Sequence, residues 1–280
     1  MIRAAVLGAD VSKSRSPAIH NAAFRALGLE GKYEAISVAA PEFAGLVADL
    51  GARGYRYLNV TIPHKAAAAA LATTRSALAR NAAAANTLVF EPDAPTAIHA
   101  ANTDGHGLLA ALADLGAEAG GQDIVLVGAG GAAAGALEAL TAAGARVRVV
   151  ARRPDTAAAL VERVPAARRP LARAMAWGDG GLARALEGSR VLVSSIPAAA
   201  WEEPAAVEGL RAIGRDTAVL EMAYGGRGPS PLAKAVRRRV ARYADGLGML
   251  VHQAARAIEL ALGESPPLAP LFAAARTAQL

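Results

Sequence analysis

The sequence predicts an α/β protein with two domains, and three observations lead to this prediction. The chain has 280 residues, which suits roughly two domains of about 150 residues each. Short runs of β-forming residues alternate with helical stretches along nearly its whole length, as is typical of parallel sheets with helices on both faces. Hydrophobic residues make up 54% of the chain, which excludes long disorder because there is ample apolar surface to bury.

The composition excludes several classes of function. The chain has no cysteine, so a disulfide scaffold and a thiol nucleophile are ruled out. The histidines lack the spacing of metal ligands, and we expect no metal site. No apolar run is long enough to span a membrane and no secretory signal is evident, so we expect a cytoplasmic protein without a membrane partner. The net charge of +6 comes from scattered basic groups without interleaved aromatics, and we expect no nucleic-acid partner.

Strands and helices can be placed in order along the chain. Apolar and β-branched runs predict strands at 4–7, 33–38, 55–60, 123–127, 146–150, 191–194 and 218–222. The first helix follows Ser14-Arg15-Ser16-Pro17, with Ser16 as the expected N-cap and Pro17 in the first turn. Gly28 has the position of the glycine that ends a helix. Helical stretches separate most of the later strands.

A glycine-rich loop marks the second domain. The strand at 123–127 runs into Gly128-Ala129-Gly130-Gly131-Ala132-Ala133 and then into a helix at 134–143. This is the order G-x-G-x-x-A between a strand and a helix, in which glycines let backbone N–H groups approach a pyrophosphate and a small third residue allows close packing. The helix N-terminus also favours negative charge. We therefore predict a Rossmann-type, doubly wound domain at 104–245 that holds a dinucleotide through Gly128, Ala129, Gly130, Gly131 and Ala132.

The end of the following strand predicts which dinucleotide is bound. An NAD site commonly has an acidic residue there to hold the ribose 2′-hydroxyl. This chain has Arg152 and Arg153 instead, and guanidinium groups pair well with a phosphate. We predict NADP as the cofactor; the alternative is that both arginines only face water.

Polar side chains gather where the predicted strands of the first domain end, which is where open α/β sheets bind ligands. These side chains are Ser14, Ser16, Thr61, Lys65, Asn86 and Asp104. Two hydroxyls beside a helix N-terminus, as at Ser14 and Ser16, suit a carboxylate. A lone lysine after a proline is usually a solvated charge, but one beside a carboxylate can move a proton during hydride transfer.

The C-terminal region is expected to return to the first domain. An amphipathic helix is predicted to begin at Asp245-Gly246 and to end at Gly263. Its apolar face consists of Leu247, Leu250, Val251, Ala254 and Ile258. We therefore expect residues 1–103 plus 246–280 to form the first, substrate-binding domain.

Six segments in a fixed order resemble a known family. They are Ser14-Arg15-Ser16-Pro17 with His20-Asn21, Asn59-Val60-Thr61-Ile62-Pro63-His64-Lys65, Asn86-Thr87, Asn102-Thr103-Asp104-Gly105, Gly128-Ala129-Gly130-Gly131-Ala132 and Asp245-Gly246-Leu247-Gly248-Met249-Leu250-Val251-His252-Gln253-Ala254. Together they resemble the NADP-dependent shikimate dehydrogenase family. This family reversibly reduces 3-dehydroshikimate to shikimate in chorismate and aromatic amino acid biosynthesis.

The resemblance also implies a role for individual residues. Lys65 and Asp104 correspond to the catalytic pair. The implied ligands of the substrate are Ser14, Ser16, Thr61, Asn86, Tyr224 and Gln253. Met222 and Gly246 correspond to contacts with the nicotinamide end of NADP. The implied partners are small molecules only, for a monomer or a homodimer.

The chain departs from the family pattern around the cofactor. Ala151 and Arg153 replace the usual Asn and Thr on either side of Arg152, Ala77 replaces an acidic residue, and Glu221 replaces an Asp. Two alternatives therefore stay open. One is a quinate/shikimate dehydrogenase with a relaxed choice of cofactor or substrate; the other is a non-catalytic NADP-binding sensor, which the presence of both Lys65 and Asp104 disfavours.

Overall fold

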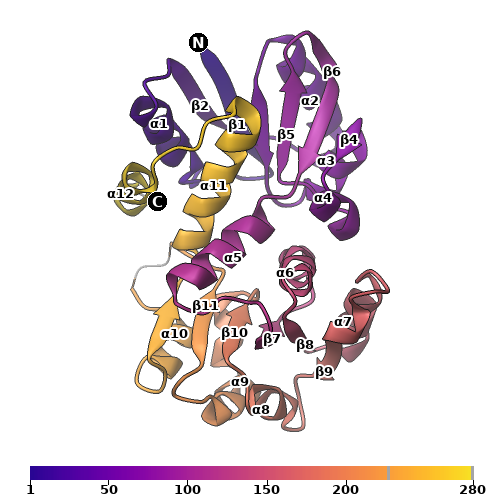
Figure 1. Cartoon of the computed structure of the whole chain (residues 1–280), viewed down its shortest axis with the longest axis vertical. Coiled ribbons are helices and arrows are strands. Elements are labelled where there is room, and N and C mark those ends of the chain that lie inside the picture. The colour runs from indigo at the N-terminus through magenta and orange to yellow at the C-terminus, as the bar shows by residue number, and fades with distance from the viewer. Residues whose placement is uncertain (226–227, 279–280) are drawn as a thin grey trace. The chain divides into compact units, whose positions relative to one another are not determined.

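The chain forms two compact units in a computed structural model that describes residues 1–225 and 228–278 (Figure 1). Unit one comprises Met1–Gly107 and Leu250–Leu280, of which 279–280 lie outside the described residues, and unit two comprises Leu108–Met249. The chain crosses from one unit to the other within helices α5 (Asp104–Asp114) and α11 (Leu247–Leu262). These crossings lie about one helical turn beyond the expected boundaries at 103/104 and 245/246, because the polar segments there begin helices.

Unit one contains a six-stranded sheet in the order β2-β1-β3-β5-β6-β4. Its strands are β1 (Ile2–Gly8), β2 (Gly31–Ser37), β3 (Tyr57–Val60), β4 (Thr74–Arg75), β5 (Thr87–Glu91) and β6 (Ala94–Ala101). Strand β5 is antiparallel to both β3 and β6, so the expectation of a purely parallel sheet is wrong for this unit. Only Pro92 and Asp93 separate β5 from β6, and so short a connection joins only antiparallel strands.

The helices of unit one include those at both ends of the chain. They are α1 (Ser16–Ala26), α2 (Phe43–Ala52), α3 (Lys65–Leu71), α4 (Ala77–Ala82) and α12 (Leu268–Thr277), with a 3₁₀ helix at Ala40–Glu42. Helix α12 packs against α1 (Figure 1), where Arg15 Nη1 donates to the carbonyl of Ala275 at 3.0 Å. Val251 and Ile258 of α11 belong to unit one and are fully buried.

The start of α1 corrects one expectation and its end confirms another. The N-cap residue is Arg15, and Ser16 is the first helical residue with no side-chain capping bond. Ser16 is therefore not the N-cap; instead its backbone N–H donates to Ser14 Oγ at 3.2 Å. At the other end Gly28 has φ +70° and donates to the carbonyl of Arg25. Glycine adopts this left-handed backbone without strain and ends the helix as predicted.

Unit two contains a second six-stranded sheet, in the order β12-β11-β10-β7-β8-β9. Its strands are β7 (Asp123–Val127), β8 (Arg146–Ala151), β9 (Ala172–Ala176), β10 (Val191–Ser194), β11 (Ala218–Glu221) and β12 (Arg242–Ala244). Every pairing is parallel. Numbered within the unit, this is the order 3-2-1-4-5-6 of doubly wound dinucleotide-binding folds, as predicted. The order reverses beside β7, so ligands are expected at the carboxyl end of that strand.

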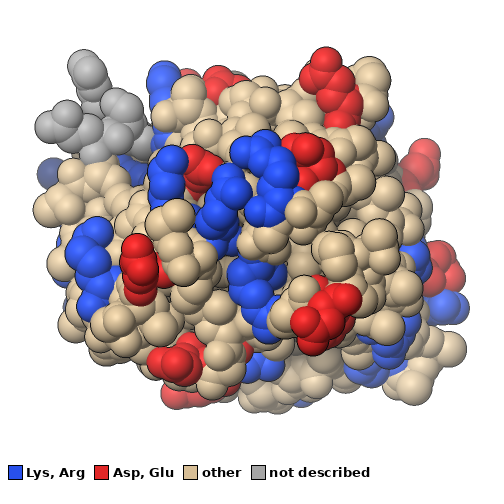
Figure 2. All heavy atoms as spheres, turned by 90° about the horizontal axis from the view of Figure 1, so that it is seen from above, with Lys and Arg blue, Asp and Glu red and all other residues tan. Residues whose placement is uncertain are grey.

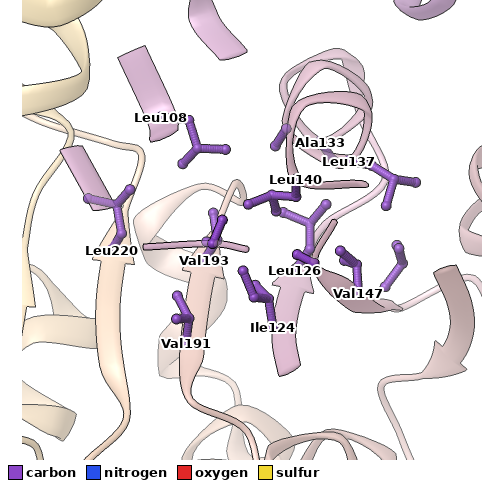
Figure 3. Packing of buried hydrophobic residues seen from close by; sticks show 14 of the residues in the cluster. Leu108, Ile124, Leu126, Ala133, Leu137, Leu140, Val147, Val191, Val193 and Leu220 are labelled. Carbon is purple, nitrogen blue, oxygen red and sulfur yellow. The ribbon is translucent and has the colours of Figure 1, made fainter. Parts of the chain in front are cut away.

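Small side chains bring a helix close to this sheet. The helices of unit two are α6 (Gly131–Ala142), α7 (Pro154–Glu162), α8 (Gly181–Leu186), α9 (Pro204–Gly209) and α10 (Pro231–Val236), with 3₁₀ helices at Arg169–Leu171, Ala198–Glu202 and Leu210–Ala212. Figure 3 shows Leu137 and Leu140 of α6 directed at strand side chains such as Leu126. Ala133, the last residue of G-x-G-x-x-A, is fully buried, which permits this close packing.

A buried histidine makes the stability of unit one depend on pH. His20 is fully buried, with its ring stacked on Tyr33 at a centroid distance of 4.0 Å and its Nδ1 2.6 Å from Tyr57 Oη. Burial lowers the pKa of His20 from 6.5 to about 3. The unfolded chain binds a proton at this residue below about pH 6.5, and the folded chain does not. Protonation of His20 in the unfolded chain therefore costs no stability well above pH 6.5, and the free energy of unfolding decreases steadily as the pH falls from there toward 3.

We therefore expect acidification to destabilise the wild type more than a His20→Gln variant. Between pH 7 and pH 5 the free energy of unfolding should fall by about 2 kcal/mol more in the wild type, because one proton binds preferentially to its unfolded state. Urea unfolding of both proteins at the two pH values measures this difference. An equal loss in both proteins would show that His20 does not carry the effect.

Candidate active site

Lys65 and Asp104 meet at one edge of the sheet in unit one. Lys65 begins α3 after strand β3, and Asp104 begins α5 after strand β6. Lys65 Nζ lies 2.6 Å from Asp104 Oδ2, and the two side chains are 27% and 22% exposed. A lysine ammonium has three N–H donors. A partly exposed amine that uses one of them on Asp104 can still donate to a bound ligand.

Asn86 joins this ion pair to a glutamine from the C-terminal region. Asn86 Nδ2 lies 2.8 Å from Asp104 Oδ1 and 3.3 Å from Gln253 Oε1. The backbone N–H of Thr103 donates to Asn86 Oδ1 at 2.7 Å, and this bond fixes which end of the amide faces Asp104. Asn86 and Gln253 are both buried. The structure thus brings together four predicted site residues: Lys65, Asp104, Asn86 and Gln253.

The predicted serine and threonine ligands lie in loops and at a helix start at the same edge of the sheet. Thr61 follows β3 and donates its backbone N–H to Leu7 of the parallel neighbour β1 at 2.8 Å. Ser14 and Ser16 lie in the loop after β1 and in the first turn of α1, where Ser14 Oγ accepts from the Ser16 N–H. Within the described part of the chain, no hydrogen bond connects these three side chains to the Lys65 cluster.

The glycine loop of unit two forms a cradle at the carboxyl end of β7. Gly128 has φ +118°, and a Cβ at this position would collide with Ser195 Oγ, so only glycine fits. Gly130 is exposed and a Cβ there would meet no heavy atom within 4 Å. Gly131 and Ala132 are exposed in the first turn of α6. The loop therefore exposes backbone at a helix N-terminus, a suitable place for a phosphate.

A cavity of about 200 Å³ connects the glycine loop with the two arginines. Its lining residues are Gly128, Ala129, Gly130, Val150, Ala151, Arg152, Arg153, Thr156, Trp177, Ile196, Pro197 and Ala200. Both arginines are exposed just after β8. Arg152 Nη1 lies 3.1 Å from Glu203 Oε1, and such an exposed ion pair is worth little. Arg152 is therefore able to turn to a phosphate, and the donor set fits NADP. Glu203 was not predicted as a site residue, because it belongs to none of the sequence motifs.

Met222 and Gly246 touch each other at the carboxyl ends of the neighbouring strands β11 and β12. A Cβ at Gly246 would collide with the carbonyl oxygen of Met222, and the Gly246 N–H donates to Ala223 at 3.1 Å. Tyr224 follows two residues after Met222 and is 39% exposed. It belongs to unit two, whereas the other five predicted substrate ligands belong to unit one.

Two polar residues behind Asn86 were not predicted as part of the site. Asn59 and Thr87 lie on the neighbouring strands β3 and β5, and both are buried and hydrogen bonded to Asn86. Their signal was a polar residue within an otherwise apolar strand run, which commonly indicates a buried hydrogen-bond network.

Figure 2 shows one face of the molecule, on which acidic side chains are interspersed among the basic ones. The described residues contain no group of three or more His, Asp and Glu side chains placed to hold a metal ion. Within residues 1–225 and 228–278, no helix is both long enough and apolar enough to cross a membrane.

Comparison with known proteins gives consistent matches over the chain. A family model described as shikimate dehydrogenase substrate binding domain matches residues 6–88, and one described as putative NAD(P)-binding matches residues 116–208. A shikimate dehydrogenase (NADP(+)) of Methylobacterium radiotolerans is 40% identical over 273 residues, which cover 96% of this chain and 94% of the relative. A second one, from Acidiphilium cryptum, is 37% identical over 264 residues, covering 94% and 91%.

Solved structures agree with the sequence relatives. The shikimate 5-dehydrogenase of Thermus thermophilus, in complex with NADP(H) and shikimate, is 31% identical with a TM-score of 0.84, covering 99% of this chain and 100% of that chain. The shikimate dehydrogenase of Mycobacterium tuberculosis is 34% identical with a TM-score of 0.85, covering 99% of both chains. With this identity along almost its full length, two units of the matching fold and the Lys65–Asp104 pair at a sheet edge, the chain belongs to the shikimate dehydrogenase family.

Proposed function

We propose that this protein catalyses the reversible NADPH-dependent reduction of 3-dehydroshikimate to shikimate. The observation that carries the proposal is the partly exposed Lys65–Asp104 ion pair, which Asn86 holds at the sheet edge of unit one. The printed names of the relatives support the choice of substrate and cofactor. The two exposed arginines beside the glycine loop support NADP over NAD.

Each proposed role follows from the chemistry of the side chain. Bound NADPH supplies the hydride that the ketone carbon accepts. Lys65 donates a proton to the ketone oxygen as negative charge develops there, and it takes the proton back in the reverse reaction. Asp104 holds the amine in place and compensates its charge. A positioned proton donor contributes typically 10²- to 10⁴-fold in rate.

The remaining residues are proposed to bind and orient the two ligands. Ser14 and Ser16, at the N-terminus of α1, suit the substrate carboxylate. The other proposed substrate ligands are Thr61, Asn86, Tyr224 and Gln253. The proposed cofactor ligands are Gly128, Ala129, Gly130, Gly131 and Ala132 for the pyrophosphate, Arg152 and Arg153 for the 2′-phosphate, and Met222 and Gly246 for the nicotinamide end. The proposal includes a monomer or homodimer in the cytoplasm, with small molecules as its only partners.

An absorbance assay tests the proposed function. NADPH consumption is followed with 3-dehydroshikimate, and the reverse reaction is followed with shikimate or quinate and either oxidised cofactor. We expect turnover with 3-dehydroshikimate and NADPH, and a higher kcat/KM for shikimate than for quinate. NADPH binding without turnover would overturn the proposal in favour of a sensor, and equal use of quinate would indicate a quinate/shikimate dehydrogenase.

Two alanine substitutions in the glycine loop should separate folding from cofactor binding. Gly128→Ala forces a Cβ against Ser195 at a positive φ, and we expect the free energy of unfolding to fall by about 2 kcal/mol. Gly130→Ala meets no protein atom but places a methyl group where the pyrophosphate is proposed to lie. It should leave stability unchanged and raise the KM for NADPH. Urea unfolding and steady-state kinetics measure the two effects, and an unchanged KM in Gly130→Ala would contradict the proposed loop contact.

A further inference from the structure

A buried chain of hydrogen bonds runs from Asn86 into the core of unit one. Thr87 Oγ1 donates to Asn86 Oδ1 at 3.1 Å. Asn59 Nδ2 donates to Thr87 Oγ1 at 3.0 Å and to the backbone carbonyl of Asn86 at 3.2 Å. Tyr33 Oη donates to Asn59 Oδ1 at 2.8 Å. All four residues are buried, with side chains that come from β2, β3, β5 and the residue before β5.

Every donor in this chain points toward the Lys65–Asp104 pair. The carbonyl of Asn86 can only accept, so it fixes the amide nitrogen of Asn59 on its own side and leaves the amide oxygen to Tyr33. Thr87 Oγ1 accepts from Asn59 and donates to Asn86 Oδ1 at 3.1 Å, which is shorter than its 3.4 Å contact with Thr103 Oγ1. Asn86 in turn donates to Asp104 Oδ1, while Asp104 Oδ2 accepts from Lys65. Hydrogen bonds aligned in series in a low-dielectric interior strengthen one another.

We propose that Tyr33, Asn59 and Thr87 are positioning residues for the catalytic pair, an inference that rests on the proposed function. None of the three is proposed to touch substrate or cofactor. The Thr103 N–H sets which end of the Asn86 amide faces Asp104, and the chain adds a second donor that holds the same amide oxygen in place. The amide in turn orients the Asp104 carboxylate that holds the Lys65 amine. A displacement of about 1 Å in a reacting group can cost about 10²-fold in rate. Loss of the Thr87 hydroxyl therefore reaches Lys65 through Asn86 and Asp104, and loss of the Tyr33 hydroxyl reaches it through Asn59 and Thr87 as well.

Tyr57 provides a matched control for Tyr33. Tyr57 lies on β3, and both tyrosines flank Ala4 of the strand β1 between them. Tyr57 is fully buried, and its ring centroid is 6.0 Å from that of Tyr33. Its hydroxyl bonds to His20 Nδ1 at 2.6 Å instead of to Asn59. Tyr57→Phe and Tyr33→Phe therefore both remove one buried hydroxyl from one aromatic cluster, but only Tyr33→Phe shortens the chain that leads to Asp104.

Steady-state kinetics of four variants test the proposal. We expect Tyr33→Phe and Thr87→Val to lower kcat about tenfold or more, with the KM for NADPH unchanged. Thr87→Ser keeps the hydroxyl and should retain kcat. Tyr57→Phe should also retain kcat, even if urea unfolding shows that it loses as much stability as Tyr33→Phe. Tyr33→Phe combined with Thr87→Val should lower kcat by less than the product of the single effects, because both interrupt one chain. Equal kcat values for Tyr33→Phe and Tyr57→Phe would overturn the proposal.

A second measurement does not depend on turnover. An amine held on a carboxylate reacts slowly with acetic anhydride, and mass spectrometry of peptides reports the labelling rate of Lys65. We expect Tyr33→Phe and Thr87→Val to raise this rate about fivefold, the factor that corresponds to a hydrogen bond of about 1 kcal/mol, and Tyr57→Phe to leave it unchanged. Unchanged labelling in all three variants would refute the positioning role. Absence of turnover in a wild type whose Lys65 shows the expected labelling pattern would refute the proposed function alone.

Discussion

Lys65→Ala should lower kcat by about 10²- to 10⁴-fold while the KM for shikimate changes little. The reason is that the ammonium acts on charge that is fully developed only in the transition state, so its removal affects the chemical step more than binding. The measurement is kcat and KM in both reaction directions. A near-normal kcat would remove Lys65 from the chemistry.

Lys32→Ala is the matched control for this prediction. Lys32 Nζ also forms an ion pair at 2.6 Å, with Glu34, but its side chain is 66% exposed and lies on β2 away from the Lys65 cluster. An exposed pair of this kind contributes little to stability, and we expect Lys32→Ala to keep wild-type kinetics. A comparable loss of kcat in both variants would point to a general effect of charge instead of proton transfer.

Arg152→Ala should raise the KM for NADPH far more than the KM for NADH. NADH lacks the 2′-phosphate, so the removal of a guanidinium that binds this group affects NADPH alone. Hydrogen bonds to charged groups are worth about 1.5–3 kcal/mol, which corresponds to an increase of roughly tenfold to a hundredfold in the KM for NADPH. Steady-state kinetics with both cofactors measure the difference, and equal effects on the two would contradict a role at the 2′-phosphate.

Arg146 offers a control on the same strand. Arg146 begins β8, whereas Arg152 follows its end, so the two arginines lie at opposite edges of the sheet. Arg146 forms an exposed ion pair with Asp123 at 2.7 Å. Arg146→Ala removes the same charge from unit two without touching the cavity beside the glycine loop, and we expect both KM values to stay unchanged.

The sequence predicted unit two more completely than unit one. Each central strand of unit two is an apolar run, such as Ile124 to Val127, and these runs are buried on both faces as parallel strands are. Unit one departs from this pattern at the hairpin of β5 and β6, because the expected alternation of strands and helices took no account of the Pro92-Asp93 turn. Strand β9 lacked any β-type signal, because alanine and arginine fill most of Ala172–Ala176.

The residues of the site were predictable only in part. Local patterns predicted the glycine loop and the arginines after β8, since both depend on neighbours in the sequence. Family resemblance pointed to Lys65 and Asp104 as partners, but their contact across 39 residues is a product of the fold. The same holds for Glu203, which reaches Arg152 from 51 residues away, and for Tyr33, whose role depends on Asn59 in another strand.

A crystal structure with NADP⁺ and shikimate bound tests the central claim most directly. We expect Lys65 Nζ to lie at a hydrogen-bond distance of about 2.6–3.2 Å from the oxygen on C3 of shikimate, with Asp104 still on the amine. The account would be contradicted by a Lys65 amine that points into bulk water. It would also be contradicted if the amine bound the substrate carboxylate or another hydroxyl instead of the oxygen on C3.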